Sequence, residues 1–505
     1  MASLHSENVN QKLPGIIQQT GRVLTRDLDR VDQLLLIVPH RRDAAMWRKI
    51  PQGNRIKDLI RTRAPRSVPA GVTRVNNRKQ TRIVLAVQPK DADAFERLTF
   101  ARKIVAAACE EKPGALGIFA VGFDDDAQGD IVSTVTAAAL AAAFVMPEYK
   151  SKPTRSPIRS IRILGLSDRI DLTRTLAEAS GNNLARWLTA MPSNKLDAVS
   201  YSKLAEDMAA NNGWQFKKYG TKELQKIGAG AFLAVAQGNE NDSAAILHIK
   251  YRPGKKTDNA DVSLVGKGII FDTGGTNLKP FEFMLDMHGD MQGSAVALGT
   301  FLAISTLELP IAVDCWLALT ENRTGPNAYK SQDVVTAANG KTIQTVHTDA
   351  EGRMALADTL VLASREKPDV IFDYATLTGS CIRALTTRYS GVFSNRSELH
   401  PALKRVGRVS GERVWPFPIG KEFLEDLESD TADFLQCSPK GNGDHILAAS
   451  FLAEFIENDI PWVHMDLGAG DNEGGLGHVT SKFTGFGVRY TMSAILDENL
   501  FKANI

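Results

Sequence analysis

The sequence predicts an α/β protein of two domains: a smaller N-terminal α/β domain and a larger C-terminal domain with a mixed, largely parallel sheet flanked by helices. Apolar strand-like runs alternate with helical patterns along the chain, an order typical of parallel sheets. The length of 505 residues suits more than one domain. Residues 1–150 carry 23 Lys and Arg against 16 Asp and Glu, whereas the remainder is acidic, which indicates two parts of different character.

The first part of the chain reads as one α/β unit. Its expected strands cover residues 34–38, 83–87, 116–121 and 161–164, and its expected helices cover 93–109 and 132–146. The segment SKPTRSP at 151–157 has the composition of a boundary, and a helical pattern at 171–190 ends before Pro192. We therefore expect an N-terminal domain at 1–165, a linker helix within 166–195 and a larger domain at 196–505.

The second part repeats the alternation. Strands are expected at 245–249, 262–265, 311–317 and 370–375, and helices at 284–307 and 353–365. In largely parallel sheets, ligands bind beyond the carboxyl ends of the strands. The polar, glycine-rich segments of this chain fall at those positions, so we expect the functional site there.

Several classes of protein are excluded. The longest apolar run, residues 137–146, is half of the roughly 20 residues that a membrane-spanning helix needs. The N-terminus has no apolar core of the kind that a secretory signal requires. The four cysteines form no CxxC pair, which favours reduced thiols and a cytoplasmic protein. There is no P-loop, HExxH helix or GxSxG elbow.

Basic residues concentrate at 41–82, a stretch that contains 13 Lys and Arg and only two acidic residues, Asp43 and Asp58. Clustered cations can bind DNA by releasing counterions from phosphates. The same composition suits a solvated or oligomer-facing surface, and no nucleic-acid-binding motif accompanies it. A DNA-binding or architectural role, with or without a catalytic activity, stays open as an alternative.

Three segments carry chemistry-bearing residues: 265–280, 284–295 and 347–360. The spacing of Asp349 and Glu351 predicts an extended segment with both carboxylates on one side, followed by a helix from Arg353. Methionines at helical spacing from Met284 to Met291 are expected to pack in the core. Together the segments supply four carboxylates, two lysines and an arginine, a set that suits two divalent cations sharing carboxylates. Such a pair could serve a peptidase or a phosphoesterase.

Taken together, the segments resemble the leucyl aminopeptidase family over about residues 180–490. HTDAEGR at 347–353 is similar to the family heptapeptide NTDAEGR, and VGKGIIFDTGGTNLKP at 265–280 resembles its VGKG-[IL]-x-FD-[ST]-GG-x-x-[IL]-K block. DMQG at 290–293 and ATLTG at 375–379 follow in the family order. The resemblance implies a metal-dependent aminopeptidase that uses a hydroxide bridging two metals to remove Leu and other, mainly apolar, N-terminal residues.

The resemblance also implies roles for individual residues. The implied ligands of the two metal ions are Lys267, Asp272, Asp290, Asp349 and Glu351. The ions would be Zn²⁺ or Mn²⁺, with Mg²⁺ or Co²⁺ possible at an exchangeable position. Lys279 would polarise the scissile carbonyl, and Arg353 would hold a bicarbonate ion as general base. The implied substrate-binding residues are Met287, Thr376, Leu377 and Gly379. The implied assembly is a cytoplasmic homohexamer acting on peptides with a free N-terminus, in which the N-terminal domain has an oligomeric or regulatory role.

Two departures from the family pattern stand out. His347 replaces an asparagine of the heptapeptide, and its imidazole can donate a hydrogen bond as the amide would. DLGAGDNEGG at 466–475 replaces a more apolar stretch that helps close the pocket for the first side chain. If Asp471 faces that pocket, we expect substrates with a polar or basic first residue to be accepted.

Overall fold

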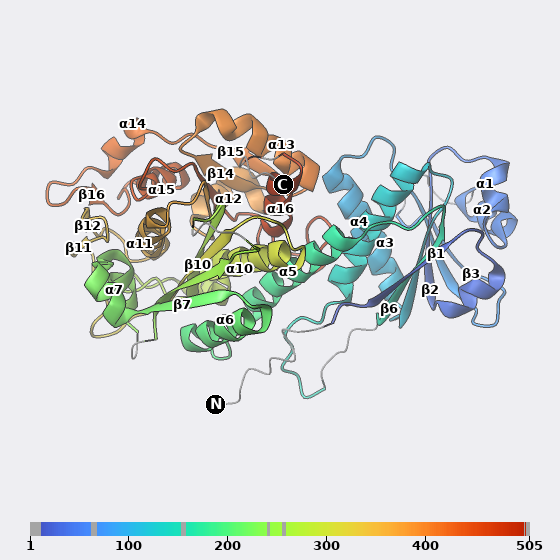
Figure 1. The fold of residues 1–505 in the computed structure, drawn as a ribbon, viewed down its shortest axis with the longest axis horizontal. Coiled ribbons are helices and arrows are strands. Elements are labelled where there is room, and N and C mark those ends of the chain that lie inside the picture. The colour runs from blue at the N-terminus through green and yellow to red at the C-terminus, as the bar shows by residue number, and fades with distance from the viewer. Residues whose placement is uncertain are drawn as a thin grey trace. The chain divides into compact units, whose positions relative to one another are not determined.

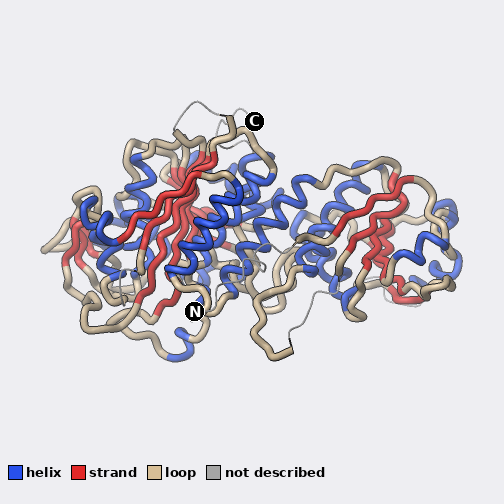
Figure 2. The backbone as a smooth tube through the Cα atoms, turned by 60° about the horizontal axis from the view of Figure 1, so that its bottom comes forward, coloured by secondary structure: helices blue, strands red, loops and turns tan. Residues whose placement is uncertain are grey.

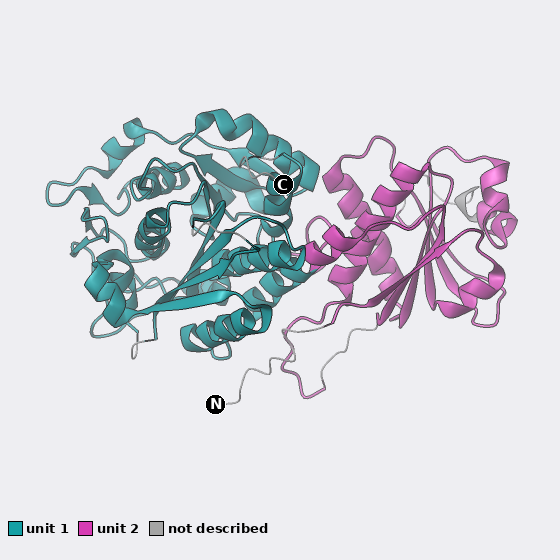
Figure 3. Ribbon diagram, viewed as in Figure 1, with its two compact units in different colours: residues 1–9, 180–472, 483–505 teal, residues 10–179, 473–482 magenta. Residues whose placement is uncertain are grey.

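The chain divides into two compact units. The structure, a computed structural model, describes residues 12–61, 68–152, 158–239, 243–254, 259–498 and 500. One unit comprises residues 10–179 and 473–482, and the other comprises 1–9, 180–472 and 483–505 (Figure 3). The division falls inside helix α5 (Thr173–Ala190), within the expected linker helix. The motif segments singled out from the sequence all belong to the larger unit.

The smaller unit is built on a six-stranded sheet in the order β1-β6-β5-β2-β4-β3. Every neighbouring pair is parallel except β3 with β4. The strands are β1 (Gly15–Thr20), β2 (Gln33–Val38), β3 (Gly71–Arg74), β4 (Arg82–Val87), β5 (Ala115–Ala120) and β6 (Ser160–Leu166). Its helices are η1 (Thr25–Arg30), α1 (Ala44–Arg48), α2 (Gly53–Arg61), α3 (Ala94–Cys109) and α4 (Asp125–Ala143). Asp93 and Asp124 cap α3 and α4 by accepting backbone N–H bonds, which stabilises both helix starts.

The larger unit contains an eight-stranded sheet in the order β15-β14-β17-β13-β9-β10-β8-β7. Figure 1 labels β7, β10, β14 and β15 of this sheet. The central four strands, β17-β13-β9-β10, are mutually parallel, whereas β8 and β14 attach antiparallel on either side. The strands are β7 (Gln215–Gly220), β8 (Ala245–Tyr251), β9 (Val262–Asp272), β10 (Val313–Asn322), β13 (Ile371–Ala375), β14 (Ser390–Ser394), β15 (Val414–Pro416) and β17 (Trp462–Asp466). A small sheet of β11 (Val334–Thr336), β12 (Thr342–Gln344) and β16 (Phe434–Leu435) accompanies it.

Helices flank the strands of both sheets (Figure 2). In the larger unit they are α6 (Ala198–Asn212), α7 (Thr221–Ile227), α8 (Gly230–Ala236), α9 (Phe281–Met284), η2 (Met287–Gly289), α10 (Gln292–Thr306), α11 (Glu351–Arg365), α12 (Gly379–Leu385), η3 (Thr386–Arg388), η4 (Ser397–Leu399), α13 (His400–Ser410), α14 (Lys421–Leu424), η5 (Glu425–Leu427), α15 (Asp444–Ala453) and α16 (Val488–Leu496). Gly266 of β9 faces the backbone of α10, and the next residue, Lys267, reaches Gly352 of α11. Because successive strand residues point to opposite faces, α10 and α11 cover opposite faces of the sheet.

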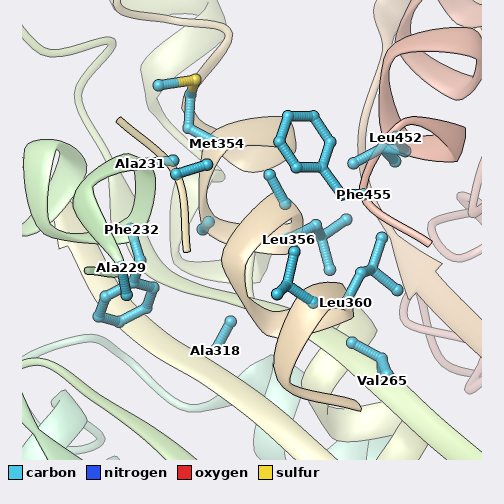
Figure 4. Close-up of a cluster of buried hydrophobic side chains, with 14 of the residues drawn as sticks. Ala229, Ala231, Phe232, Val265, Ala318, Met354, Leu356, Leu360, Leu452 and Phe455 are labelled. Atoms are coloured by element: carbon cyan, nitrogen blue, oxygen red, sulfur yellow. The ribbon is translucent and has the colours of Figure 1, made fainter. Parts of the chain in front are cut away.

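Helix α11 is held by a fully buried core. Figure 4 shows Leu356 and Leu360 of this helix among Phe232 of α8, Val265 of β9 and Phe455. These side chains have almost no exposed surface. Burial of each such side chain contributes about 1.5–3 kcal/mol to folding, so α11 is a rigid support for the residues at its first turn.

The structure confirms the predicted α/β class and corrects two local expectations. The segment 284–307 is not one helix, because α9, η2 and α10 are separate. Of its methionines, Met291 is in the core, whereas Met284 and Met287 are only partly buried. Asp349 and Glu351 do not lie in an extended segment, because a turn precedes Glu351, the first residue of α11. In the second place, Thr348 of the turn bonds to Gly274 and Asn277 of a distant loop, a tertiary contact that local periodicity does not indicate. Among the described helices, none has the length and apolarity needed to cross a bilayer.

Candidate active site

Four parallel strands bring the predicted site together. β9 and β10 end opposite each other at Asp272 and Asn322, and β13 and β17 end opposite each other at Ala375 and Asp466. The segments that follow these strands therefore meet at one edge of the sheet, where α/β proteins bind ligands. Helix α11 starts at the same edge with Glu351.

A cavity of about 820 Å³ opens at this edge. Its wall includes every residue that the sequence assigned to the site. They are Lys267, Asp272, Lys279, Met287, Asp290, Asp349, Glu351, Arg353, Thr376, Leu377 and Gly379. Residues from four separate segments, up to 112 positions apart, thus share one wall.

Three carboxylates form the centre of the cluster. One ligand atom from each of Asp272, Asp290 and Glu351 lies within 4.8 Å of the others, and all three side chains are buried. The ammonium of Lys267 lies 2.9 Å from Asp290 Oδ1 and 3.0 Å from Glu351 Oε1. A Cβ on Gly352 would stand 2.5 Å from Cε of this lysine, so only glycine leaves room for it.

The electrostatics of the cluster follow from its burial. Burial raises the pKa of Glu351 to about 8 and that of Asp290 to about 6, and the neighbouring carboxylate of Asp272 adds to both shifts. Burial opposes the charged form of Lys267, but the carboxylates of Asp290 and Glu351 outweigh it and raise the pKa of this lysine. The ammonium thus neutralises part of the negative charge.

A second lysine bridges the rim of the cluster. Lys279 Nζ lies 2.9 Å from Asp272 Oδ2 and also pairs with Asp349. Thr348, fully buried, ties the two motif loops together: its Oγ1 donates to Gly274 O at 2.6 Å, and its N–H donates to Asn277 Oδ1 at 2.8 Å. The 272–279 and 347–353 loops are therefore held as one unit.

The residues present fit divalent metal ions. Carboxylate oxygens converge from three elements, and Asp290 Oδ2 is buried without a hydrogen-bond partner in the described chain. A buried acceptor of this kind is costly unless something satisfies it. Four carboxylates face only two lysines, so the cluster keeps an excess of negative charge that cations would balance.

Three residues that support the site were not singled out from the sequence. Asn322 Nδ2 donates to Asp272 Oδ1 at 2.8 Å and orients that carboxylate. Asp466 accepts the N–H of Leu377 at 3.1 Å and the hydroxyl of Thr378 at 2.7 Å, and so fixes the loop after β13. Asn322 and Asp466 stand at the carboxyl ends of strands, a position that could have indicated them from the sequence. The third residue, Asp444, follows no strand, and no local pattern indicates it.

Asp444 pairs with the predicted catalytic arginine. Arg353 Nη2 donates to Oδ1 and Oδ2 of Asp444, both at 2.8 Å, and Nη1 donates to Gln436 O at 3.2 Å. The guanidinium is buried, and both charged side chains line the cavity. An anion is thus already present at the position where the family resemblance implies bicarbonate.

The departures from the family pattern have structural outcomes. His347 is exposed at the cavity rim, and its Nδ1 accepts the N–H of Asp349 at 3.3 Å. Asp466 and Leu467 line the cavity, whereas Asp471 forms an isolated bridge with Phe483 and is not part of the described cavity wall. The expectation that substrates with a polar or basic first residue are accepted required Asp471 to face the cavity, and it does not line the described wall.

The basic stretch is partly neutralised. Arg74 pairs with Glu111 at 2.7 Å, Lys79 pairs with Asp32 at 2.6 Å, and the buried Arg82 pairs with Glu110. Residues 62–67 of the stretch lie outside the described residues. Within the described part, no observation supports the DNA-binding alternative.

Comparisons with known proteins agree with the site. The model of the cytosol aminopeptidase family, catalytic domain, matches residues 183–492. A probable cytosol aminopeptidase of Aquifex aeolicus is 36% identical over 376 residues, covering 74% of this chain and 75% of that protein. One of Parasynechococcus marenigrum is 35% identical over 426 residues, covering 82% and 85%.

The fold is shared with a solved structure. A mutant of tomato leucine aminopeptidase superposes with a TM-score of 0.82 at 24% identity, over 96% of this chain and 97% of that one. This likeness confirms the two-domain α/β fold. The family match, the relatives and the motif residues gathered on one cavity wall confirm the resemblance seen in the sequence. The chain belongs to the cytosol aminopeptidase family and is a hydrolase of the aminopeptidase class.

Proposed function

We propose that the chain removes N-terminal residues, Leu and other mainly apolar ones, from peptides by two-metal catalysis. The observation that carries this proposal is the convergence of the carboxylate cluster and two lysines on one cavity wall. The metal ligands are Lys267, Asp272, Asp290, Asp349 and Glu351. Zn²⁺ or Mn²⁺ suits this donor set, with Mg²⁺ or Co²⁺ at an exchangeable position. Bound metals supply polarisation of the scissile carbonyl and activation of the attacking water.

The remaining side chains bind and orient the peptide. Lys279, held between two carboxylates, donates to the carbonyl oxygen as negative charge develops on it. The backbone carbonyl of Leu377 accepts from the free α-amine, which makes the activity that of an exopeptidase. Met287, Thr376 and Gly379 line the space for the first side chain. The neighbouring Ile382 and Leu467 add apolar surface to the wall, which supports a preference for apolar residues.

We further propose that the catalytic part is residues 196–505 and that residues 1–165 serve assembly or regulation of a cytoplasmic homohexamer. The separate core of the smaller unit supports a distinct role for it. Sedimentation of the purified protein tests the assembly. A single species at the mass of one 55.0 kDa chain would contradict the hexamer.

Hydrolysis of a Leu-anilide reporter tests the proposed function. The protein is stripped of metal and then supplied with Mn²⁺ or Zn²⁺. We expect activity to return with metal, to be absent in Asp349→Ala, and to be absent on an N-acetylated substrate that lacks the free amine. Phosphate esters should stay intact, which separates the peptidase from a phosphoesterase. No hydrolysis with any of the metals by a folded protein would contradict the proposal, and a preference for Arg or Lys over Leu and Met would contradict the apolar pocket.

A further inference from the structure

The strongest unassigned feature of the cavity is the carboxylate of Asp444. It accepts two hydrogen bonds at 2.8 Å from Arg353 Nη2, a charge-assisted contact. The arginine lies two residues after Glu351, in the first turn of α11. The Asp444 side chain is 28% exposed although its partner is buried, and it lines the same cavity as Lys279 and the carboxylate cluster. A carboxylate fixed by Arg353 thus lines the cavity that the proposed function assigns to the peptide.

The position of Asp444 is set by its own helix. It is the first residue of α15, after Gly443, whose φ of +61° gives the chain a left-handed turn at that point. The next residue, His445, donates its N–H to Ser380 Oγ at 2.8 Å and contacts the same oxygen through Nδ1 at 3.0 Å. Ser380 belongs to α12 and also lines the cavity. Asp444 is therefore held directly by Arg353 and, through its neighbour His445, by Ser380.

We propose that the carboxylate of Asp444 is the general base of the peptidase reaction, in place of the bicarbonate ion that the family resemblance implies. The inference rests on the proposed function. Arg353 can hold one carboxylate-shaped anion through Nη2, and the chain itself supplies that anion. A tethered base is present at every turnover, whereas a free ion must be bound from solution, so the enzyme works without bicarbonate.

The proton transfers balance without any added co-reactant. Asp444 takes one proton from the attacking water as the water oxygen bonds to the scissile carbonyl carbon. The remaining hydroxyl becomes part of the new carboxylic acid. When the C–N bond breaks, the proton on Asp444 passes to the leaving nitrogen, and the carboxylate is restored. Its pairing with Arg353 holds it in one orientation through both steps.

A purely structural role is the competing explanation, because a buried arginine needs a partner in any case. Arg353 Nε also has no acceptor in the described chain, so an additional anion could bind there. Each explanation makes its own prediction. A structural Asp444 would affect stability, metal content or KM, and an additional anion would make the unsubstituted protein bind bicarbonate.

The first arm of the test uses the unsubstituted holoenzyme in carbon-dioxide-free buffer. We expect hydrolysis of the Leu-anilide to be unchanged when bicarbonate is added. We expect no binding of ¹³C-labelled bicarbonate by NMR line broadening, a readout independent of activity. Stimulation of more than about threefold, or bicarbonate binding at Arg353, would overturn the proposal.

The second arm compares variants at fixed metal content. Asp444→Gly opens the anion position, and we expect kcat to fall about 100-fold or more without bicarbonate, with little change in KM. Added bicarbonate or formate should raise the kcat of this variant at least about tenfold. The variant should also bind ¹³C-bicarbonate. Asp444→Asn keeps the shape but cannot accept the proton, and we expect it to be inactive and not rescued. The matched control is Asp459→Gly, which removes the carboxylate of an exposed Arg396 pair outside the cavity and should change nothing.

The remaining outcomes are also decisive. If Asp444→Gly loses its metal or its fold, Asp444→Asn alone decides, and activity within about threefold of the unsubstituted protein overturns the proposal. Loss without rescue in the glycine variant, at normal metal content, assigns Asp444 a structural role and also overturns it. If the unsubstituted protein hydrolyses no peptide, the proposed function has failed and Asp444 has no proton to transfer.

Discussion

Two clusters of metal-capable side chains lie at opposite ends of the same elements. Helix α11 begins with Glu351 in the active-site cluster, and directly after its last residue Glu366 joins a second group with His248 and Asp314. Strand β10 likewise carries Asp314 near its start and ends at the active site. In each cluster the three ligand atoms lie within 4.8 Å of one another.

The two clusters differ in charge balance. In the second cluster, Asp314 pairs with Arg252 at 2.6 Å and Glu366 pairs with Lys250 at 2.6 Å. Burial lowers the pKa of His248, which stacks on a tryptophan ring and stays neutral. Two carboxylates thus meet two cations there, whereas in the active site four carboxylates meet two. The ligand atoms are equally close together in both clusters, so the uncompensated negative charge is what distinguishes the proposed metal site.

The largest expected difference between the clusters is in metal content. Glu351→Ala removes a buried oxygen ligand, and we expect loss of bound metal and a fall in peptide hydrolysis of at least about 1000-fold. Metal analysis after dialysis, beside the Leu-anilide assay, measures both. Asp314→Ala is the matched variant in the second cluster and should keep its metal. Equal metal loss in the two variants would remove the distinction between them.

The next effect concerns stability. Asp314→Ala removes the carboxylate that pairs with the largely buried Arg252, whose bonds to the carbonyls of Tyr251 and Val313 do not balance its charge, and we expect destabilisation of about 3–5 kcal/mol. Thermal unfolding of the metal-loaded protein measures it as a lower Tm. An unchanged Tm would show that the second cluster contributes no net stability, and the charge-balance argument would then rest on the active site alone.

A smaller effect comes from the glycine beside Lys267. Gly352→Ala places a Cβ 2.5 Å from Cε and 2.7 Å from Nζ of the lysine, which must move away from Asp290 and Glu351. We expect metal affinity to fall about 10- to 100-fold, as for other changes that misorient ligands. Gly129→Ala in helix α4, where a Cβ meets nothing within 4 Å, is the control and should leave affinity unchanged. Metal titration that shows equal affinities in both variants would contradict this account.

The smallest effect is one of pH. Because burial raises the pKa of Glu351 to about 8 and that of Asp290 to about 6, the metal-free site holds protons that a metal must displace. We expect metal addition at pH 7 to release protons into weakly buffered solution. Metal affinity should fall as pH drops below about 8, by up to about tenfold per unit for each proton displaced. Asp314→Asn should release the same number of protons as the unsubstituted protein. If neither protein released protons on metal addition, the raised pKa values would be contradicted.

The sequence by itself determined the fold class and the composition of the site. Strand and helix periodicity is local, so elements such as those expected at 83–87 and 93–109, which are β4 and α3 in the structure, follow from neighbouring side chains alone. The motif residues were also readable, because each loop carries its ligands within a few positions. The parallel order of the strands then required those loops to meet at one edge of the sheet.

Only the tertiary structure decided how the ligands are supported and which anion Arg353 meets. Asp444 is 91 positions from Arg353, and Asp466 is 89 positions from the loop that it fixes at Leu377. The turn before Glu351 likewise depends on the contacts of Thr348 with the 272–279 loop. Local sequence patterns hold no information about such pairs, because hydrogen bonds between distant segments form only when packing of the core brings those segments within about 3 Å of each other.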